Sequence, residues 1–153
     1  MKKKNASIVI VGLVVIFAIV ALFVNFANVF KDPSYYTVFT AMFGSNEKQR
    51  PVIPVLVVAM CLEILGIIIP FFALPLDKKG QKIVFLTEIL VLLGAIVIFF
   101  FTPTLYAAAN PVRDGGEEAR TLELGTGTIC TITFACLAVA ASFLGFMSAR
   151  KED

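Results

Sequence analysis

Two carboxylic acids stand out in this sequence because each lies inside a long apolar stretch. Glu63 lies near the middle of the run Val52–Leu76, and Glu88 lies six residues after Lys82. At a rise of about 1.5 Å per helical residue, we expect Glu63 near the midplane of a bilayer and Glu88 about 9 Å from its nearer surface. None of the apolar runs contains a Lys, Arg or His that would pair with these acids.

Isolated carboxyl groups in hydrocarbon suggest two kinds of chemistry. An ionised carboxylate is costly there, so we expect Glu63 and Glu88 to be protonated or to face a hydrated cavity. One hypothesis is a proton- or cation-coupled site, for which Glu63 is the better candidate because Glu88 can reach toward Lys82. The other hypothesis is a protonated carboxyl that anchors neighbouring helices by a hydrogen bond. An expected separation of about 10 Å in depth makes the two acids poor ligands for one shared metal ion.

The first apolar run offers further polar candidates, Asn25 and Asn28. At helical spacing they share a face with five small or apolar residues, namely Ser7, Val11, Val14, Ala18 and Ala21. Such a face is expected to point into a helix bundle. The two asparagines would then line a vestibule near the outer end of the helix or bond to the outer loops. From its depth, Glu63 is expected to face Ala18 on the first helix and Ala135 or Ala138 on the last.

The last apolar run carries small residues four positions apart, which predicts close helix packing. Two such series overlap, and their members are Ala138 and Ser142 in one and Ala141, Gly145 and Ala149 in the other. This face either packs within one chain or joins two copies of it.

The composition argues against most enzyme chemistry. Histidine is absent, which removes the commonest general base and metal ligand. Cys61, Cys130 and Cys136 lie in apolar runs without a C-x-x-C spacing, so we expect small buried residues rather than a redox pair. No Gly-rich phosphate loop, no nucleophile beside a base and no surface for nucleic acid is recognisable. The sequence therefore predicts no catalytic residue, no metal site and no cofactor.

The elements that must position these residues are four apolar runs. They are Ile8–Phe30, Val52–Leu76, Ile83–Phe101 and Ile129–Met147, in a chain that is 59% hydrophobic with a mean hydropathy of +0.92. Each has about the 20 residues that a membrane-spanning helix needs. The runs are continuous rather than alternating, which excludes barrel strands. We therefore predict an all-α membrane protein, a single four-helix transmembrane bundle with helices at about 7–30, 51–75, 82–102 and 118–149.

The distribution of Lys and Arg predicts the orientation. With the N-terminus inside, eight basic residues fall inside and five fall outside, the latter being Lys31, Lys48, Arg50, Arg113 and Arg120. We therefore expect both termini in the cytoplasm, two longer outer loops and a location in the plasma membrane. The charged segment 77–82 forms a tight inner turn. The first run exceeds the apolar core of a usual signal peptide, so it is expected to remain as the first helix.

The outer segment 33–43 has two possible structures. Asp32 as a cap, Pro33 and Gly44 suit the ends of a short helix, and Val38, Phe39, Met42 and Phe43 share one helical face. This pattern favours an amphipathic helix on the outer membrane surface. The alternative is a strand, because the segment 35–40 is rich in residues that favour β-structure.

The second outer loop begins at Thr102–Pro103, which is expected to end or kink the third helix. The sequence Asp114–Gly115–Gly116 indicates a turn. Glu117 then suits the N-terminal end of a helix dipole, so the last helix is expected to start near that residue and to run unbroken to about Ala149.

In layout, the chain resembles tetraspan proteins such as claudins. It has four helices, a tight inner turn and two outer loops, but it lacks the Trp and the paired cysteines of the claudin first loop. Small multidrug transporters also combine four helices with a membrane Glu, although theirs lies on the first helix. The favoured hypothesis is a tetraspan with a structural or accessory role in the bilayer, assembled with itself or with a larger membrane partner. The alternative is a minimal proton- or cation-coupled transporter or channel that uses Glu63.

Overall fold

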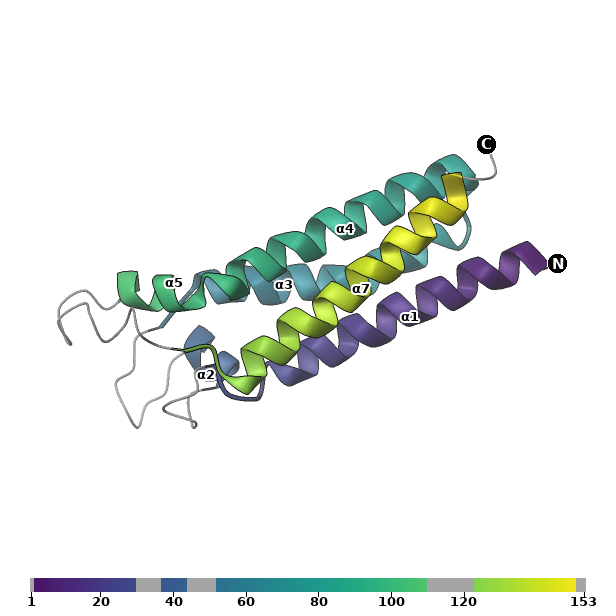
Figure 1. Ribbon diagram of the computed structural model, residues 1–153. Coiled ribbons are helices and arrows are strands. Elements are labelled where there is room, and N and C mark those ends of the chain that lie inside the picture. The colour runs from purple at the N-terminus through teal and green to yellow at the C-terminus, as the bar shows by residue number, and fades with distance from the viewer. Residues whose placement is uncertain (1, 30–36, 44–51, 110–122, 151–153) are drawn as a thin grey trace.

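Every regular element in the described part of the chain is a helix. A computed structural model describes residues 2–29, 37–43, 52–109 and 123–150 (Figure 1). Its α-helices and one 3₁₀ helix are α1 (Lys2–Val24), α2 (Val38–Phe43), α3 (Val55–Ile68), η1 (Ile69–Ala73, 3₁₀), α4 (Lys78–Phe100), α5 (Thr102–Ala109) and α7 (Thr126–Arg150). The predicted all-helical fold class is confirmed.

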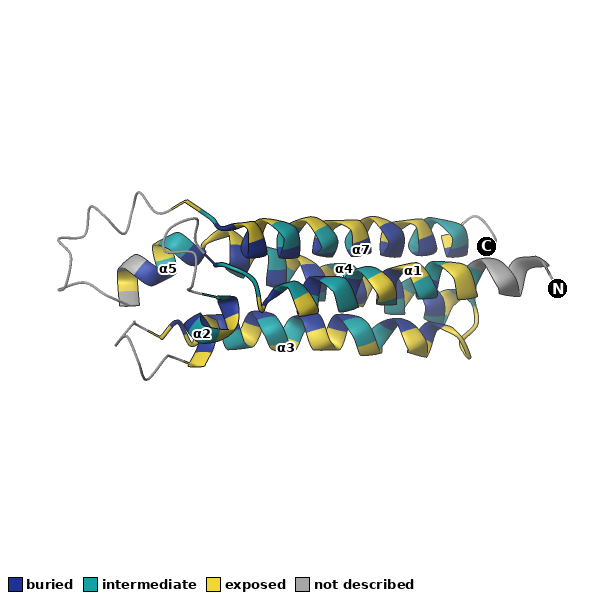
Figure 2. Ribbon diagram, turned by 90° about the horizontal axis from the view of Figure 1, so that it is seen from below, coloured by how far each residue is buried: buried dark blue, intermediate teal, exposed yellow. Residues whose placement is uncertain are grey.

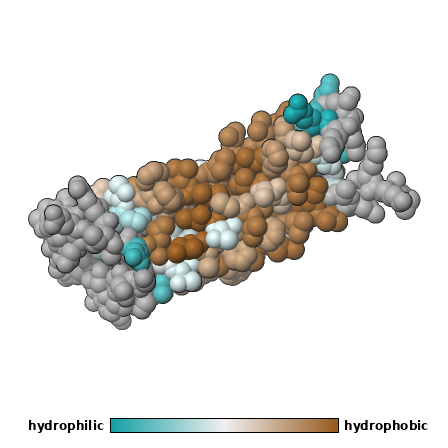
Figure 3. All heavy atoms as spheres, in the orientation of Figure 1, coloured by the Kyte–Doolittle hydropathy of each residue, from teal (hydrophilic) through white to brown (hydrophobic). Residues whose placement is uncertain are grey.

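Four stretches of helix are long and apolar enough to cross a membrane. They are Ser7–Val24, Val55–Ala73, Lys78–Phe100 and Thr126–Arg150. Many large apolar residues are exposed. Figure 2 shows exposed positions recurring along the spans, and apolar residues form a band between the two ends of the bundle on the face shown in Figure 3. An apolar exterior of this extent is unusual for a protein surrounded by water. The chain is therefore a multi-pass membrane protein.

The spans form a four-helix bundle in which α7 is the best-packed helix. α7 lies between α1 and α4, and α3 contacts α4 and α1 on the other side, so the order around the bundle axis is α1, α7, α4, α3. The start of α1, the end of α7 and the connection from η1 to α4 lie together at one end, here called the turn end (Figure 1). α2 and α5 lie at the opposite end, here called the loop end.

The first helix is shorter than predicted because the chain beyond it serves as a hydrogen-bond acceptor for other elements. α1 ends at Val24 rather than near residue 30. The carbonyl of Ala27 accepts from the Val38 amide at 3.2 Å, and that of Val29 accepts from the Gly125 amide at 2.8 Å. A continuing helix would use these carbonyls itself. The segment 25–29 therefore joins α1 to α2 and to the start of α7.

The turn between the second and third spans is also shorter than predicted. α4 begins at Lys78 rather than at residue 82, because Asp77 caps it by accepting a bond from the Gly80 amide at 2.9 Å. On the other side of the turn, the α-helical geometry of α3 changes to a 3₁₀ helix at Ile69, with Pro70 in its first turn. Proline removes one backbone donor, which accounts for the change.

The last span starts later than predicted, and the third stops near the predicted break. Residues 123–125 are not helical and α7 begins at Thr126, so no continuous helix runs from residue 118. Gly125 donates instead to the segment that follows α1, which holds residues 123–125 out of the helix. α4 ends at Phe100, and the separate short helix α5 begins at Thr102 with Pro103 in its first turn.

Within the segment 33–43, for which a helix and a strand were both considered, Val38–Phe43 is helical, while Thr37 pairs with Asn28 in an isolated β-bridge. α2 is capped by Thr37, whose hydroxyl accepts from the Thr40 amide at 3.1 Å, while the predicted cap Asp32 lies outside the described residues. Val38 and Met42 are buried, but Phe39 and Phe43 are exposed. Of the four residues predicted to share one helical face, two therefore face the interior of the bundle and two are exposed on its outside.

Candidate functional site

A buried hydrogen-bond network joins three of the four spans near the loop end. The Asn25 amide nitrogen donates to Glu63 Oε2 at 2.5 Å, and the Thr131 hydroxyl contacts the Asn25 amide oxygen at 3.1 Å. The same hydroxyl lies 3.4 Å from the carbonyl oxygen of Ala21. Glu63 and Thr131 are fully buried, and Asn25 is 3% exposed. We call Asn25, Glu63 and Thr131 the Asn25 network.

The position of Asn25 in the chain explains why it can reach across the bundle. It is the first residue after α1, where the backbone tightens and the Asn25 amide bonds to the carbonyl of Leu22 at 3.2 Å. Asparagine is well suited to such an end because its short amide competes with the regular helix bonds. Its donor and acceptor then serve two different helices, α3 and α7.

A second polar pair lies deeper toward the turn end, on α4 and α7. Glu88 and Ser142 are both fully buried. Neither oxygen of Glu88, nor the hydroxyl of Ser142, nor Oε1 of Glu63 has a hydrogen-bond partner among the described residues. Buried polar atoms without a partner are rare in proteins and call for an explanation.

The two carboxyl groups are related through Gly66, which is one turn beyond Glu63 on α3. A Cβ atom placed on Gly66 would lie 3.4 Å from Glu88 Oε1 and 2.6 Å from a methyl carbon of Leu92. Gly66 therefore faces the stretch of α4 between Glu88 and Leu92. The carboxyl of Glu88 therefore lies beside the turn of α3 that follows Glu63.

The arrangement provides oxygen ligands without a fixed positive charge close by. Between Ser7 and Val24, α1 contains no ionisable residue, and α7 contains no Asp, Glu, Lys or Arg before Arg150. Within the described residues, no cluster of three His, Cys, Asp or Glu side chains is suited to a metal ion. The site can therefore anchor helices by hydrogen bonds, or hold a proton or a single small cation.

The hydrogen-bond partner of Glu63 is not among the neighbours predicted from depth, which were Ala18 and Ala135 or Ala138. Asn25, rather than Ala18, reaches Glu63 from α1. Ala18, Ala135 and Ala138 are all buried. Asn25 does bond to the segment that was expected to form the first outer loop, because its backbone carbonyl accepts from the Phe39 amide of α2 at 3.1 Å. Its side chain, in contrast, bonds inside the bundle to Glu63.

Asn28 and Thr131 also make contacts that the sequence did not fully predict. Asn28 does bond to neighbouring elements, but through its backbone: its carbonyl accepts from the Thr128 amide at 3.3 Å, and it pairs with Thr37 in an isolated β-bridge. Thr131 was missed by the sequence reasoning. The one sequence feature that could have pointed to Thr131 is its position, because this hydroxyl residue shares a helical face of the last run with Ala135, Ala138 and Ser142.

The small residues of the last span lie inside the bundle. Ala138, Ala141, Ser142, Gly145 and Ala149 are all buried. A Cβ atom on Gly145 would lie 2.7 Å from the ring of Phe85, and Ala138 and Ala141 share a buried cluster with Val14 of α1 and Leu92 of α4. Of the two interpretations of this face, its burial favours packing within one chain.

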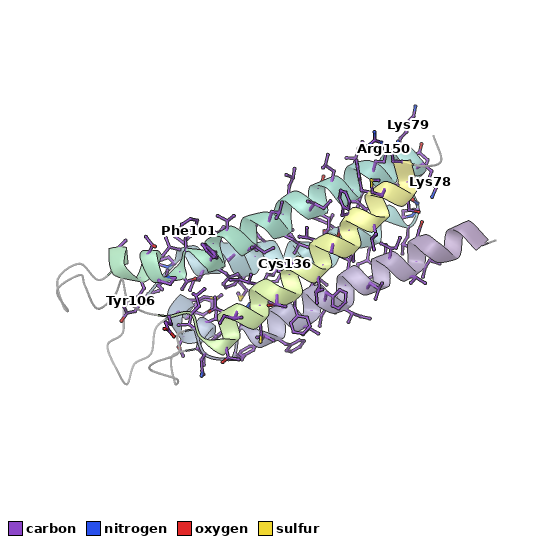
Figure 4. The ribbon with its side chains drawn as sticks, viewed as in Figure 1. Lys78, Lys79, Phe101, Tyr106, Cys136 and Arg150 are labelled. Atoms are coloured by element: carbon purple, nitrogen blue, oxygen red, sulfur yellow. The ribbon has the colours of Figure 1, made fainter. Side chains whose placement is uncertain are left out.

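The cysteines are placed differently from the expectation of buried residues. All three are free thiols, and Cys61 and Cys136 are exposed on the outside of the bundle, while Cys130 is half-buried. Figure 4 labels Cys136 midway along α7. Because α3 and α7 lie diagonally across the bundle, no redox pair between Cys61 and Cys136 follows from their positions.

The chain was compared with known proteins at three levels. No protein-family model, no curated protein and no solved structure gives a significant match.

Proposed function

We propose that this chain is a small structural or accessory protein of the membrane, without enzymatic activity. The observation that carries the proposal is the bond from Asn25 to Glu63, which gives the most conspicuous membrane carboxyl a buried partner on another helix. In hydrocarbon, such polar contacts act as interhelical anchors. The rest of the interior is filled by apolar and small side chains packed between the spans.

A structural role also fits the loop end of the molecule. The segment after α1, the helix α2 and the start of α7 are joined by backbone hydrogen bonds rather than left as independent loops. Such an end offers an ordered surface to a second copy of the chain or to a larger membrane protein. We propose one of these as the partner, alongside the lipid bilayer itself, and no nucleic acid.

The proposed location is the plasma membrane, with the turn end in the cytoplasm. Lys78, Lys79 and Arg150 gather at that end (Figure 4). Juxtamembrane Lys and Arg are retained on the cytoplasmic side during insertion, which supports the orientation. Both termini would then be cytoplasmic, and the two longer loops would lie outside.

The experiment that tests the structural role is a flux measurement on purified protein in sealed vesicles. Proton and alkali-cation fluxes are compared for wild type, Glu63→Gln and empty vesicles. A scaffold is expected to give no flux above the empty vesicles in either case. A wild-type flux that Glu63→Gln abolishes would replace the structural role with transport.

The second candidate function is proton- or cation-coupled transport through Glu63. One observation favours it: Oε1 of Glu63 is buried and has no hydrogen-bond partner among the described residues, which leaves it available to a proton or a cation. A flux that depends on Glu63 and on the pH difference across the vesicle would establish this candidate. Absence of flux over the whole pH range in which the protein stays folded would exclude it.

A further inference from the structure

The contacts between α4 and α7 fix the register at which their polar side chains meet. Toward the turn end, Gly145 packs against the ring of Phe85. Toward the loop end, Ala138 and Ala141 share a buried cluster with Leu92. The two helices run in opposite directions, so residues between these contacts pair in reverse order along the interface.

Glu88 and Ser142 lie between those two contacts. Each is one helical turn from the Phe85–Gly145 contact in the direction of the loop end, so they occupy the same level on facing helices. Both are 0% exposed. The carboxyl of Glu88 lies beside Gly66 of α3, since a Cβ atom placed there would be 3.4 Å from Glu88 Oε1.

Ser142 differs from the threonines of the same helix. The hydroxyls of Thr128 and Thr133 bond to backbone carbonyls, those of Val29 and Ile129, and Thr131 belongs to the Asn25 network. The Ser142 hydroxyl has no hydrogen-bond partner among the described residues, although a helical serine commonly bonds to the preceding turn. A fully buried hydroxyl and a fully buried carboxyl, both without partners at one level, indicate a ligand shared between them.

We propose that Glu88 and Ser142 form a buried site for one monovalent cation, either a proton or a sodium ion. Glu88 neutralises the charge, and the Ser142 hydroxyl oxygen accepts from the acid proton through a bridging water or coordinates the sodium ion. The proposal does not depend on the structural role, because a bound cation is compatible with a protein that transports nothing.

The donor set and the surroundings decide the class of ligand. The ligands are oxygens only, which suits a hard cation or a proton rather than a soft metal. A single carboxylate balances a single positive charge, and a net charge in this apolar interior would be costly. Besides Glu88, the ionisable groups on the elements packed here are Glu63 and the exposed Cys61 on α3 and the thiols Cys130 and Cys136 on α7. At the turn end they are Lys78, Lys79 and Lys82 of α4 and Arg150 of α7. α1 carries Lys2, Lys3 and Lys4 at its start and no ionisable residue between Ser7 and Val24.

The test uses the full-length protein in detergent and dicyclohexylcarbodiimide, an apolar reagent that modifies protonated carboxyl groups. Peptide mass spectrometry measures the labelling rate of Glu88 against pH, in sodium chloride or in choline chloride of equal ionic strength. If the ligand is sodium, sodium slows the labelling and choline does not. If it is a proton, the labelling falls as pH rises and is the same in both salts. In the Glu88→Gln variant the label on residue 88 is removed, so this variant identifies any label that belongs to Glu63.

The role of Ser142 is tested by Ser142→Ala, with Ser148→Ala on the same helix as the matched control. Ser142→Ala is expected to raise the sodium concentration needed for protection about tenfold, because an oxygen ligand is lost. In the proton case it is expected to shift the labelling profile by about one pH unit toward lower pH, because a hydrogen bond that favours the protonated acid is lost. Ser148→Ala is expected to behave as wild type. Glu88 that is never labelled, or a labelling profile that neither sodium nor Ser142→Ala changes, would overturn the proposal.

Discussion

At the scale of single residues, the carboxyl of Glu63 is defined by what it contacts. Asn25 donates to it, and Thr131 orients the same amide from α7, so one side chain at the end of α1 ties three spans together. Interhelical hydrogen bonds in membranes are modest, averaging about 0.6 kcal/mol in double-mutant cycles. In this bundle the hydrogen bonds of the Asn25 network fix the register of the helices, in addition to the free energy that they contribute.

Thr131→Val tests the part of the network on α7. The substitution keeps the shape of the side chain but removes the hydroxyl that contacts Asn25, so we expect the free energy of unfolding to fall by about 0.6–1.7 kcal/mol. Unfolding by SDS in mixed micelles measures the change. Thr133→Val is the control, because the Thr133 hydroxyl is exposed and bonds only to its own helix. Equal effects of the two substitutions would show that Thr131 does not act through Asn25.

At the scale of elements, α7 owes its central place to small side chains. Gly145 and the alanines on either side let α1 and α4 approach the same helix closely. The polar ends of the elements follow from capping: Asp77 starts α4, and Thr37 starts α2. The positions of these capping residues set the lengths of the connections between helices. The lengths of the connections in turn determine which residues face one another.

Gly145→Leu is expected to disturb the fold of a single chain. The new side chain would meet the ring of Phe85, and overpacking of this kind costs about 1–3 kcal/mol. The same substitution at Gly12, where nothing lies within 4 Å of an added Cβ, is the control and should be tolerated. The measurement is unfolding in mixed micelles, with the mass of the protein–detergent complex recorded in parallel. A Gly145→Leu protein of unchanged stability but reduced oligomeric mass would place Gly145 between chains instead.

The sequence was sufficient to predict the spans but not their register. Continuous apolar runs identify membrane helices, because the bilayer demands length and apolarity alone. Depth counted from the ends of a run assumed a helix that continues past Asn25, whereas the chain leaves the helix there to bond with α2 and α7. Glu63 and Asn25 were each singled out, but their contact depends on tertiary bonds about which a single sequence carries no information.

At the scale of the whole molecule, the four spans bring the two ends of the described chain to one side of the bundle. Lys2 at the start of α1 and Arg150 at the end of α7 lie at the turn end (Figure 1). An even number of crossings requires this arrangement, and the Lys and Arg residues decide which side of the membrane it faces. The sequence predicts the cytoplasmic side for this end.

Thiol labelling on intact cells tests this orientation. In a background where Cys61, Cys130 and Cys136 are replaced by alanine, single cysteines are introduced at Ser45, Gly115 or Gly80. A membrane-impermeant maleimide is expected to label the first two positions and to label Gly80→Cys only after the cells are opened. Labelling of Gly80→Cys alone on intact cells would reverse the orientation.

The most direct test of the structural account is a double-mutant cycle between Asn25 and Glu63, read as free energies of unfolding in mixed micelles. Glu63→Gln keeps an acceptor for the Asn25 amide and is expected to stay within about 0.5 kcal/mol of wild type, while Glu63→Leu leaves that buried donor unpaired and is expected to cost about 1–3 kcal/mol. In the Asn25→Ala background, the difference between the Gln and Leu substitutions is expected to become smaller. If Gln destabilises the protein as much as Leu does, or if the difference is the same with and without Asn25, the carboxyl of Glu63 is not an anchor between helices.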